Sequence, residues 1–395
     1  MDIKTAIGTS SKKDPYEAAN EAVASCRKKF PGLEADLAIV FSTCGLANPI
    51  LLKNIQKLIK PGVPLIGCSA AALITPSGIL KEGVILLLLS CPKTKISCYS
   101  VEGIRAKGHF AAGVELAGNI LQTVKGMRRE MCVVFSDGLL EDTSDFLKGM
   151  QNAFGTSFPI IGGNSADNLS FSQTYQFYNG NVFSQGAVAA LFAQKLNFGF
   201  GVRHGWKPLG KIHTVTASYA NIIQEIDGKK AAALYEDYFA KTLAQLQKDT
   251  LLINTLYPIG IYLDKENEYL LRNAMLFNNN GSIVTHDTIA LGSKIRLMIG
   301  TKDSCIESAK QAAAQVKSDM RDKKIELLLV INSASRLRLL GRSADEEINA
   351  LKEVLGQDIP CVGFYGYGQQ APLRSLKYFG HSYYHNQAIA LLGIG

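Results

Sequence analysis

One local pattern, a buried strand followed by a helix and a second buried strand, occurs three times in this chain. A repeated unit constrains the architecture more than any single residue does. The copies cover residues 36–70, 131–168 and 325–368, and in each the second strand starts as proline, two apolar residues and glycine (Gly67, Gly162, Gly363). This pattern predicts parallel strand pairs joined by a helix, with glycine-containing turns that gather at one end of a sheet.

Hydrophobic periodicity predicts the other elements. Helical spacing is present at 48–60, 229–247 and 305–320. The crossover helices of the second and third copies begin after the N-cap candidates Thr143 or Ser144 and Ser343, and Glu346 gives the latter a capping-box pattern. Longer β segments follow each copy, with turn signals at 179–181 and 279–281.

These elements predict a mixed α/β protein with two β-rich lobes covered by helices, for which we consider an αββα layering. A boundary near residues 220–230 gives an N-terminal domain at 1–222 and a C-terminal domain at 223–395. Because no Pro- or Ser-rich linker separates the domains, we expect them to share a tight interface.

Charge and hydropathy exclude several classes of protein. The net charge is 42 − 34 = +8, but basic residues occur in short groups such as Lys12 and Lys13, typical of solvated faces rather than a nucleic-acid-binding stripe. The longest apolar run, 84–89, is too short to span a membrane, and no secretory signal precedes the first strand. Eight cysteines without a C-x-x-C pair predict reduced thiols, no metal site and a cytoplasmic location.

The motifs in this order resemble the FIST family, the sensory domain named for F-box and intracellular signal transduction proteins. They are VPLIGCSAAALI (63–74), VVFSDG (133–138), FPIIGGNSADN (158–168), FGVRHGWKPLG (200–210), IDGKKAAALYEDY (226–238), NSASR (332–336), CVGFYGYG (361–368) and HNQ (385–387). The resemblance implies a ligand-sensing module for small molecules such as amino acids, without a cofactor. We expect no preceding F-box. Ser333 and Gln369 depart from the family pattern, and the latter lacks a carboxylate that an ammonium group would need.

Several of these motifs offer groups that suit a small polar ligand. Adjacent glycines let backbone N–H groups approach a ligand, and an arginine at a strand end can hold a carboxylate with both arms of its guanidinium. A turn stabilised by Asn or Asp is the structural alternative for 162–167, and Arg338 and Arg342 are expected to be solvated. The candidate ligand-binding residues are Cys68, Ser69, Asp137, Gly162, Gly163, Asn164, Asp167, His204, Trp206, Arg336, Tyr365, Tyr367, Gln369 and His385.

The function favoured by the sequence is a stand-alone cytoplasmic sensor of an amino acid or small carboxylate, acting on a signalling partner. One alternative is a hydrolase that uses Cys68 or Ser69 as nucleophile, because 67–71 approaches the G-x-S-x-G elbow and His204 follows. The other is a protein-recognition scaffold, which predicts an exposed apolar patch instead of a polar pocket.

Overall fold

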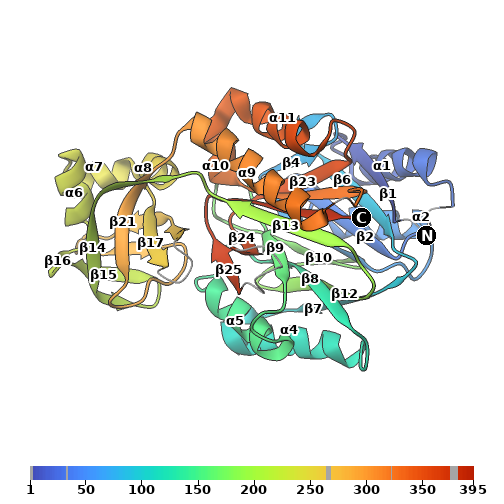
Figure 1. The fold of residues 1–395 in the computed structure, drawn as a ribbon, viewed down its shortest axis with the longest axis horizontal. Helices are drawn as coiled ribbons and strands as arrows, with labels where there is room; N and C mark the ends of the chain where they lie inside the picture. The colour runs from blue at the N-terminus through green and yellow to red at the C-terminus, as the bar shows by residue number, and fades with distance from the viewer. Residues whose placement is uncertain (1–2, 33, 264–267, 322, 374–380) are drawn as a thin grey trace.

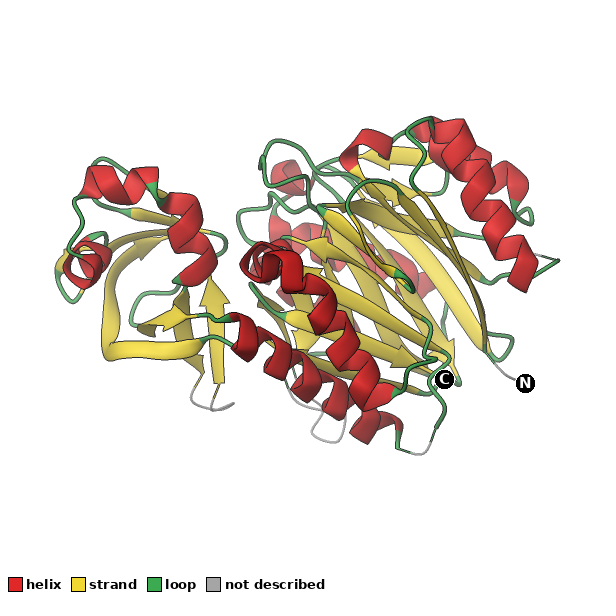
Figure 2. Cartoon of the chain, turned by 90° about the horizontal axis from the view of Figure 1, so that it is seen from above, coloured by secondary structure: helices red, strands yellow, loops and turns green. Residues whose placement is uncertain are grey.

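The computed structural model describes residues 3–32, 34–263, 268–321, 323–373 and 381–395, and these form four sheets with helices on their outer faces (Figure 1). Three of the sheets make a large body. The fourth belongs to a small lobe, residues 207–300, which stands apart from the body in two perpendicular views (Figures 1 and 2). The fold is therefore mixed α/β, as predicted.

The three sheets of the body repeat one strand order. Each places an antiparallel pair beside the parallel pair predicted from sequence and ends in a two-stranded hairpin. The first sheet runs β1 (Lys4–Ser10), β6 (Val84–Ser90), β2 (Leu37–Thr43), β3 (Leu65–Ala70), β10 (Gln176–Tyr178), β11 (Asn181–Phe183). The second runs β7 (Thr94–Val101), β12 (Ala187–Gln194), β8 (Arg129–Ser136), β9 (Ile160–Asn164), β24 (Gln369–Pro372), β25 (Ser382–His385). The third runs β13 (Phe198–Arg203), β26 (Ile389–Ile394), β22 (Leu327–Ser333), β23 (Cys361–Gly366), β4 (Ala72–Thr75), β5 (Gly78–Leu80).

The terminal hairpins are exchanged cyclically between the three units. The hairpin β4–β5 follows β3 in sequence but completes the third sheet, β10–β11 follows β9 but completes the first, and β24–β25 follows β23 but completes the second. Each sheet thus contains backbone from two units. The predicted division at residue 222 stays a prediction, and strands from both sides of it pair in the second and third sheets.

The repeated glycines hold the two parallel strands of each unit in register. Val40 pairs with Gly67, Val134 with Gly162 and Val330 with Gly363. A Cβ added at any of these glycines would lie 1.8 Å from the carbonyl oxygen of the paired valine. The prediction that these glycines form turns is wrong: they lie inside strands, where only hydrogen fits between the two backbones.

Alternation along the strands divides the apolar side chains between two layers. Leu37, Ile39 and Phe41 of β2 face a core shared by all three sheets, while Ala38 and Val40 face the outer helices. At the centre of the shared core the Phe41 ring lies 5.3 Å from that of Phe135 and 4.7 Å from that of Phe364, centroid to centroid. One aromatic contact therefore joins the three units.

Helices cover the outer face of each sheet. The first sheet packs against α1 (Pro15–Lys29) and α2 (Pro49–Leu58), and the second against α4 (His109–Gln122) and α5 (Thr143–Phe154). The third packs against α9 (Lys302–Met320) and α11 (Ala344–Leu355). Short helices are η1 (Cys44–Leu46), α3 (Ile104–Lys107), α10 (Ala334–Leu340) and η2 (Gly341–Ser343). No helix of the described residues is long and apolar enough to cross a membrane.

The small lobe is inserted between β13 and α9 and has its own apolar core. Its strands are β14 (Lys207–Tyr219), β15 (Ile222–Ile226), β16 (Lys229–Lys230), β17 (Ile259–Leu263), β18 (Glu268–Arg272), β19 (Ala274–Phe277), β20 (Ile283–Thr285) and β21 (Lys294–Ile299). Three helices cover them: α6 (Ala233–Phe239), α7 (Leu243–Lys248) and α8 (Thr250–Leu256).

Several local predictions are confirmed and several are wrong. The turns at 179–181 and 279–281 and the helix at 305–320 are present. The helix predicted over 229–247 is interrupted, because Ala240 adopts a left-handed conformation (φ 50°) that separates α6 from α7. Asp142, rather than Thr143 or Ser144, caps α5, and Ser343 precedes α11 without a capping hydrogen bond from its side chain.

The paired glycines generate a stability prediction. We expect Gly162→Ala to lower the free energy of unfolding by about 3 kcal/mol or more, because the new methyl group must displace the Val134 carbonyl and with it the β8–β9 register. Gly118→Ala is the matched control, since a Cβ there meets no atom within 4 Å and alanine favours the helix by about 1 kcal/mol. Urea unfolding followed by circular dichroism measures both. Equal stability of the two variants would contradict the role given to Gly162.

Candidate functional site

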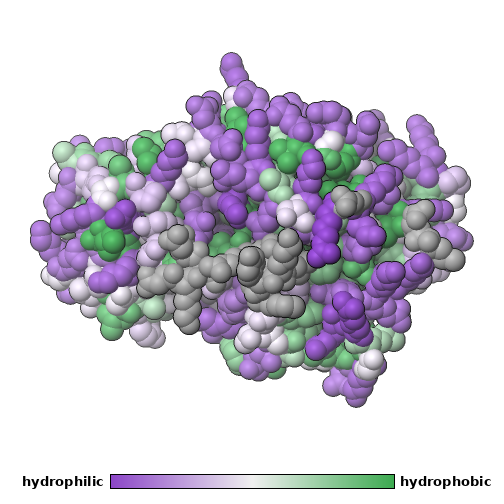
Figure 3. Space-filling model, viewed as in Figure 1, coloured by the Kyte–Doolittle hydropathy of each residue, from purple (hydrophilic) through white to green (hydrophobic). Residues whose placement is uncertain are grey.

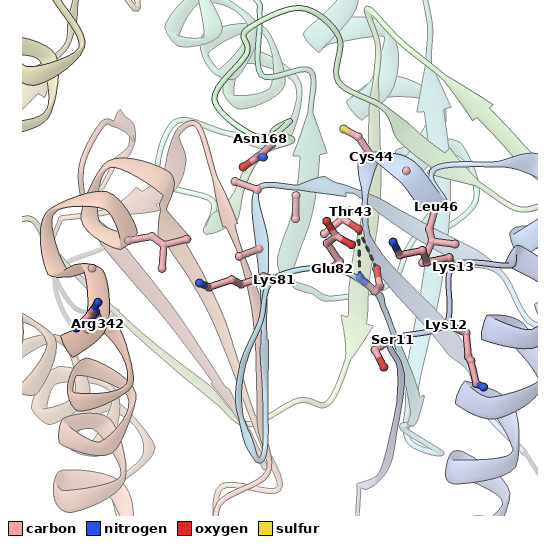
Figure 4. Close-up of a pocket in the computed structure, with 17 residues that line it drawn as sticks. Ser11, Lys12, Lys13, Thr43, Cys44, Leu46, Lys81, Glu82, Asn168 and Arg342 are labelled. Carbon is pink, nitrogen blue, oxygen red and sulfur yellow. Dashed lines mark hydrogen bonds between the residues drawn. The ribbon is translucent and has the colours of Figure 1, made fainter. Parts of the chain in front are cut away.

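An open cleft of about 780 Å³ lies at the carboxyl ends of β2 and β3, between the first and third units (Figure 4). Ligands of α/β proteins commonly bind at this end of parallel strands, where the loops diverge. The cleft, here called the basic cleft, is lined by 11–13, 43–46, 70–72, 81–83, Asn168, Leu337, Gly341 and Arg342.

Four segments bring side chains to this cleft because each leaves a strand or helix there. Residues 11–13 follow β1, 43–46 pass from β2 into η1, 81–83 join β5 to β6, and Arg342 lies in η2 directly after α10. Thr43 ties two of them together, since its backbone N–H donates to the Gly83 carbonyl at 3.0 Å and its Oγ1 accepts from the Gly83 N–H at 3.2 Å. The floor is thus built on the strand ends themselves.

The cleft is strongly cationic. Lys12, Lys13, Lys81 and Arg342 line it, against one carboxylate, Glu82. Lys12 makes an exposed 3.8 Å ion pair with Glu17, whereas the other three cations have no carboxylate partner within 4 Å among the described residues. Unpaired like charges around one concavity raise the local concentration of anions.

The half-buried thiol of Cys44 lines the cleft and interacts with Ser69 and Asp167, two residues predicted from sequence. Its Sγ is 3.6 Å from the Ala166 carbonyl, which also accepts a 2.9 Å hydrogen bond from Ser69 Oγ. Burial raises the pKa of the Cys44 thiol, and the charge of Asp167 adds to this. The thiol is therefore neutral at pH 7, and none of the described residues that line the cleft is a histidine that would deprotonate it.

The motif 162–167 contacts other parts of the protein, and none of its residues lines the cleft. Asn164 lies fully buried in β9, donates to the Asp137 carbonyl at 2.7 Å and accepts from Gln370 Nε2 at 3.0 Å. Asp137 in turn accepts from the backbone N–H groups of Leu139 and Gln185, and its burial raises its pKa. Gly162 and Gly163 allow close backbone packing against neighbouring strands.

Asp167 organises the loop that leads to Asn168 and the cleft. Its carboxylate accepts hydrogen bonds from the backbone N–H groups of 170–173 and from the Tyr367 hydroxyl. Burial alone would raise the pKa of Asp167, but these hydrogen bonds lower it to about 2. Tyr367 also stacks on Phe171 with ring centroids 4.5 Å apart, so both predicted residues order this loop.

Arg336 does not hold a ligand carboxylate, because it is saturated by the protein. Its side chain is fully buried in α10 and forms an ion pair with the equally buried Glu347 of α11. The remaining N–H groups donate to the carbonyls of His204 and Cys305 and to Ser308 Oγ. As the sequence predicts, a strand ends shortly before Arg336, but a helix starts directly after Ser333 and turns the Arg336 side chain into the protein.

Around this ion pair lie three further predicted residues. Trp206 packs with its ring 6.0 Å from the Arg336 guanidinium, and His204 Nδ1 accepts from the Trp206 backbone N–H at 2.9 Å. Both residues line a separate surface pocket of about 600 Å³ beside Glu268 and the start of α9. Tyr365 is buried near Glu347, and burial raises its pKa far above the usual range. We call the Arg336–Glu347 ion pair and the residues around it the base of the small lobe, because they adjoin the chain segments that connect this lobe to the body.

Cys68 and Ser69 lie inside β3 and are fully buried. Cys68 belongs to the shared core, where burial raises its pKa well above the usual value, and Ser69 Oγ donates to the Ala166 carbonyl and accepts from the Tyr175 backbone N–H. The local reason is that 67–70 continue a strand instead of forming an exposed elbow. A nucleophile in either position has no access to a substrate.

Buried polar side chains form a junction between the small lobe and the second unit. Of the residues at this junction, the sequence analysis identifies only Gln369 and His385. His286 of the small lobe donates through Nε2 to the Gly138 carbonyl at 3.0 Å, and Arg272 donates to the Tyr384 carbonyl at 3.1 Å. Asp287 accepts from the backbone N–H and the hydroxyl of Ser144 at the start of α5. No motif signals such contacts, because their partners are more than 100 residues apart.

Burial sets the protonation of this junction. It lowers the pKa of His286 and of His385 to about 4, so both are neutral, and it raises the pKa of Asp287 to about 7 despite Arg272 at 4.0 Å. His385 donates to the Ala371 carbonyl at 3.0 Å, and Gln369 accepts from the Ala388 N–H. Both predicted residues are therefore structural partners of neighbouring strands.

The residues that sequence reasoning missed are the cations of the basic cleft. The sequence pattern predicts a solvated face for Lys12 and Lys13 and a solvated side chain for Arg342. They are exposed, but they gather around one concavity with Lys81. The only local signal for this cleft is that each of these cations follows a strand or helix that ends beside it. Among the described residues, no group of three or more His, Cys, Asp or Glu is placed to hold a metal ion.

Comparison with known families matches two family models in succession. The FIST N domain matches residues 36–229 and the FIST C domain matches residues 231–372. An uncharacterized protein of Methanocaldococcus jannaschii is 26% identical over 248 residues, which are 59% of this chain and 46% of that protein. An uncharacterized protein of Mycobacterium tuberculosis is 20% identical over 94% of this chain and 95% of its own length. The chain therefore spans less than half of the archaeal relative.

Among solved structures, a cyanuric acid hydrolase from A. caulinodans covers 99% of both chains at 7% identity, with a TM-score of 0.39. A second cyanuric acid hydrolase structure covers both chains fully at 6% identity, with a TM-score of 0.40. A likeness at this level says nothing about the chemistry of this chain.

The buried ion pair generates a prediction about the base of the small lobe. We expect Arg336→Met to lower the free energy of unfolding by about 3–5 kcal/mol, because it leaves the Glu347 carboxylate buried without its partner. Adding Glu347→Met should recover part of this loss, although the carbonyls of His204 and Cys305 stay unpaired. Chemical denaturation of both variants measures the coupling. A double variant less stable than the single one would contradict this assignment.

Asp287 generates a pH prediction. Its folded-state pKa is raised to about 7, so its contribution to stability is present at low pH and is lost as pH rises from about 4 to 7. We expect Asp287→Asn to become more stable relative to the native chain over that range, by at most about 1.4 kcal/mol per pH unit. Denaturation midpoints of the two proteins between pH 4.5 and 7.5 measure the difference. A difference that is constant with pH would show that Asp287 is ionised throughout.

Proposed function

The chain belongs to the FIST family, whose domains are sensory modules of signal transduction, and we propose that it senses a small carboxylate or amino acid bound in the basic cleft. The observation that carries this proposal is the set of cations Lys13, Lys81 and Arg342, which have no carboxylate partner within 4 Å among the described residues. They surround a cleft of about 780 Å³ at the carboxyl ends of β2 and β3. A volume of this size accommodates a small metabolite. We place the function in the cytoplasm, which stays a prediction.

Binding is favoured over hydrolysis by the groups that face the cleft. The thiol there, Cys44, has a raised pKa, and the lining offers no histidine among its described residues. The nucleophiles of the hydrolase alternative, Cys68 and Ser69, are buried in β3. Acyl transfer needs an accessible nucleophile beside a base, and among the described residues that line the cleft the Cys44 thiol has no histidine beside it.

The helix α10 connects the cleft to the small lobe. Leu337 of α10 and Arg342 directly after it line the cleft, while Arg336 of the same helix holds the carbonyls of His204 and Cys305. His204 lies where the chain leaves the body for the small lobe, and Cys305 lies where the chain returns to the body. A ligand that binds Arg342 therefore acts next to the helix that holds both of these chain segments. It shifts the position of the small lobe only if it binds one arrangement of the lobe and the body more tightly than another.

The small lobe offers a surface for a signalling partner. Of the twelve large apolar side chains that are exposed among the described residues, seven belong to 207–300: Ile212, Tyr219, Tyr238, Leu251, Leu252, Leu276 and Leu291. Apolar patches on this lobe are visible at the left of the space-filling view (Figure 3). This concentration supports the lobe as the output of the sensor and also favours the scaffold alternative.

A thermal-shift screen of amino acids and small carboxylates tests the proposed function. A ligand at 100 times its Kd should stabilise the folded chain by about 2.7 kcal/mol, which for a protein of this size raises Tm by about 3 °C. Arg342→Ala should abolish the rise, whereas Arg338→Ala, which removes an exposed arginine of α10 outside the cleft, should preserve it. A rise that both variants keep would place the ligand elsewhere, and no rise with any compound would favour the scaffold.

A further inference from the structure

We propose that the ligand of the basic cleft carries two anionic groups separated by a short apolar chain, as an α,ω-dicarboxylate does. One group is held by Lys13 and the other by Lys81 with Arg342. This inference rests on the proposed function and names the class of metabolite that the site takes.

The cations stand on two opposite walls. Lys81 and Arg342 lie together on the side of the third unit, and Lys13 lies across the cleft on the side of α1 (Figure 4). Lys81 belongs to the connection between β5 and β6, and Arg342 to η2 after α10, so two elements remote in sequence supply one pair of charges. Each wall therefore offers its own positive charge to a ligand.

The charges balance best with a dianion. The lining carries four cations and one carboxylate, and Glu82 lies near Lys13 between the walls (Figure 4). Lys13, Lys81 and Arg342 have no carboxylate partner within 4 Å among the residues that the structure describes. Two linked anionic groups balance more of this positive charge than one does, and the second contact forms at the high effective concentration that the linker imposes.

Apolar side chains form part of the lining of the cleft. These are the side chains of Ala70, Ala71, Ala72, Leu46 and Leu337, and the neutral thiol of Cys44 lines the cleft with them. Methylene groups pack favourably against such side chains. The lining therefore suits charged ends joined by a hydrocarbon chain.

Isothermal titration of the full chain with malonate, succinate, glutarate and adipate tests this inference against acetate, butyrate, hexanoate and inorganic phosphate. We expect one dicarboxylate to bind at least tenfold more tightly than the monocarboxylate of matching length, with a clear optimum in chain length. Lys13→Met and Arg342→Ala should each reduce that dicarboxylate to the affinity of a monocarboxylate. Lys95→Met and Arg338→Ala, which change exposed cations outside the cleft, should leave it unchanged.

The outcomes separate this inference from the proposed function. Equal affinity for monocarboxylates and dicarboxylates, lost in Arg342→Ala but kept in Lys13→Met, would leave the sensor standing and overturn the two-ended ligand. Phosphate binding as tightly as the best dicarboxylate would also overturn it, because the cleft would then be a general anion site. Binding that survives both cleft variants would overturn the two-ended ligand and the proposed site together.

Discussion

The rest of the structure depends on the close pairing of two parallel strands at Gly67, Gly162 and Gly363. Each glycine lets its strand approach the carbonyl of a paired valine at a distance that no side chain permits. That register places Phe41 and Phe135 on the inner face, where they meet Phe364 of the third unit. It also fixes where β2 and β3 end, and hence where the cleft opens.

The cyclic exchange of hairpins turns three similar units into one cooperative body. Every sheet ends in a hairpin that belongs to another unit, so no unit can unfold without breaking a neighbour's sheet. The carboxyl ends of the three parallel strand pairs nevertheless have different surroundings. In the first unit the position is an open cationic cleft, in the second His286 of the small lobe reaches Gly138, and in the third Arg336 ties α10 to the base of that lobe.

A buried ion pair links two of these positions. The Arg336–Glu347 pair holds both chain crossings to the small lobe, and the helix that carries Arg336 also forms a wall of the cleft. A fully buried pair is kept in place because breaking it leaves an uncompensated charge. In the proposed function this connection is the route by which a ligand in the cleft acts on the small lobe, a role that a weak surface ion pair would not serve.

By itself the sequence determined the three strand–helix–strand units, the apolar layers and the family, because these depend on local periodicity and on the order of motifs. It also pointed to residues with specific interactions, such as Asn164, Asp167 and Arg336, since polar groups in apolar segments need hydrogen-bonding or charged partners. Only the tertiary structure decided that their partners are Asp137, Tyr367 and Glu347 rather than a ligand. It alone gathered Lys13, Lys81 and Arg342, because hydrogen bonds and charges act between groups that are near in space, and their distance along the chain carries no record of that proximity.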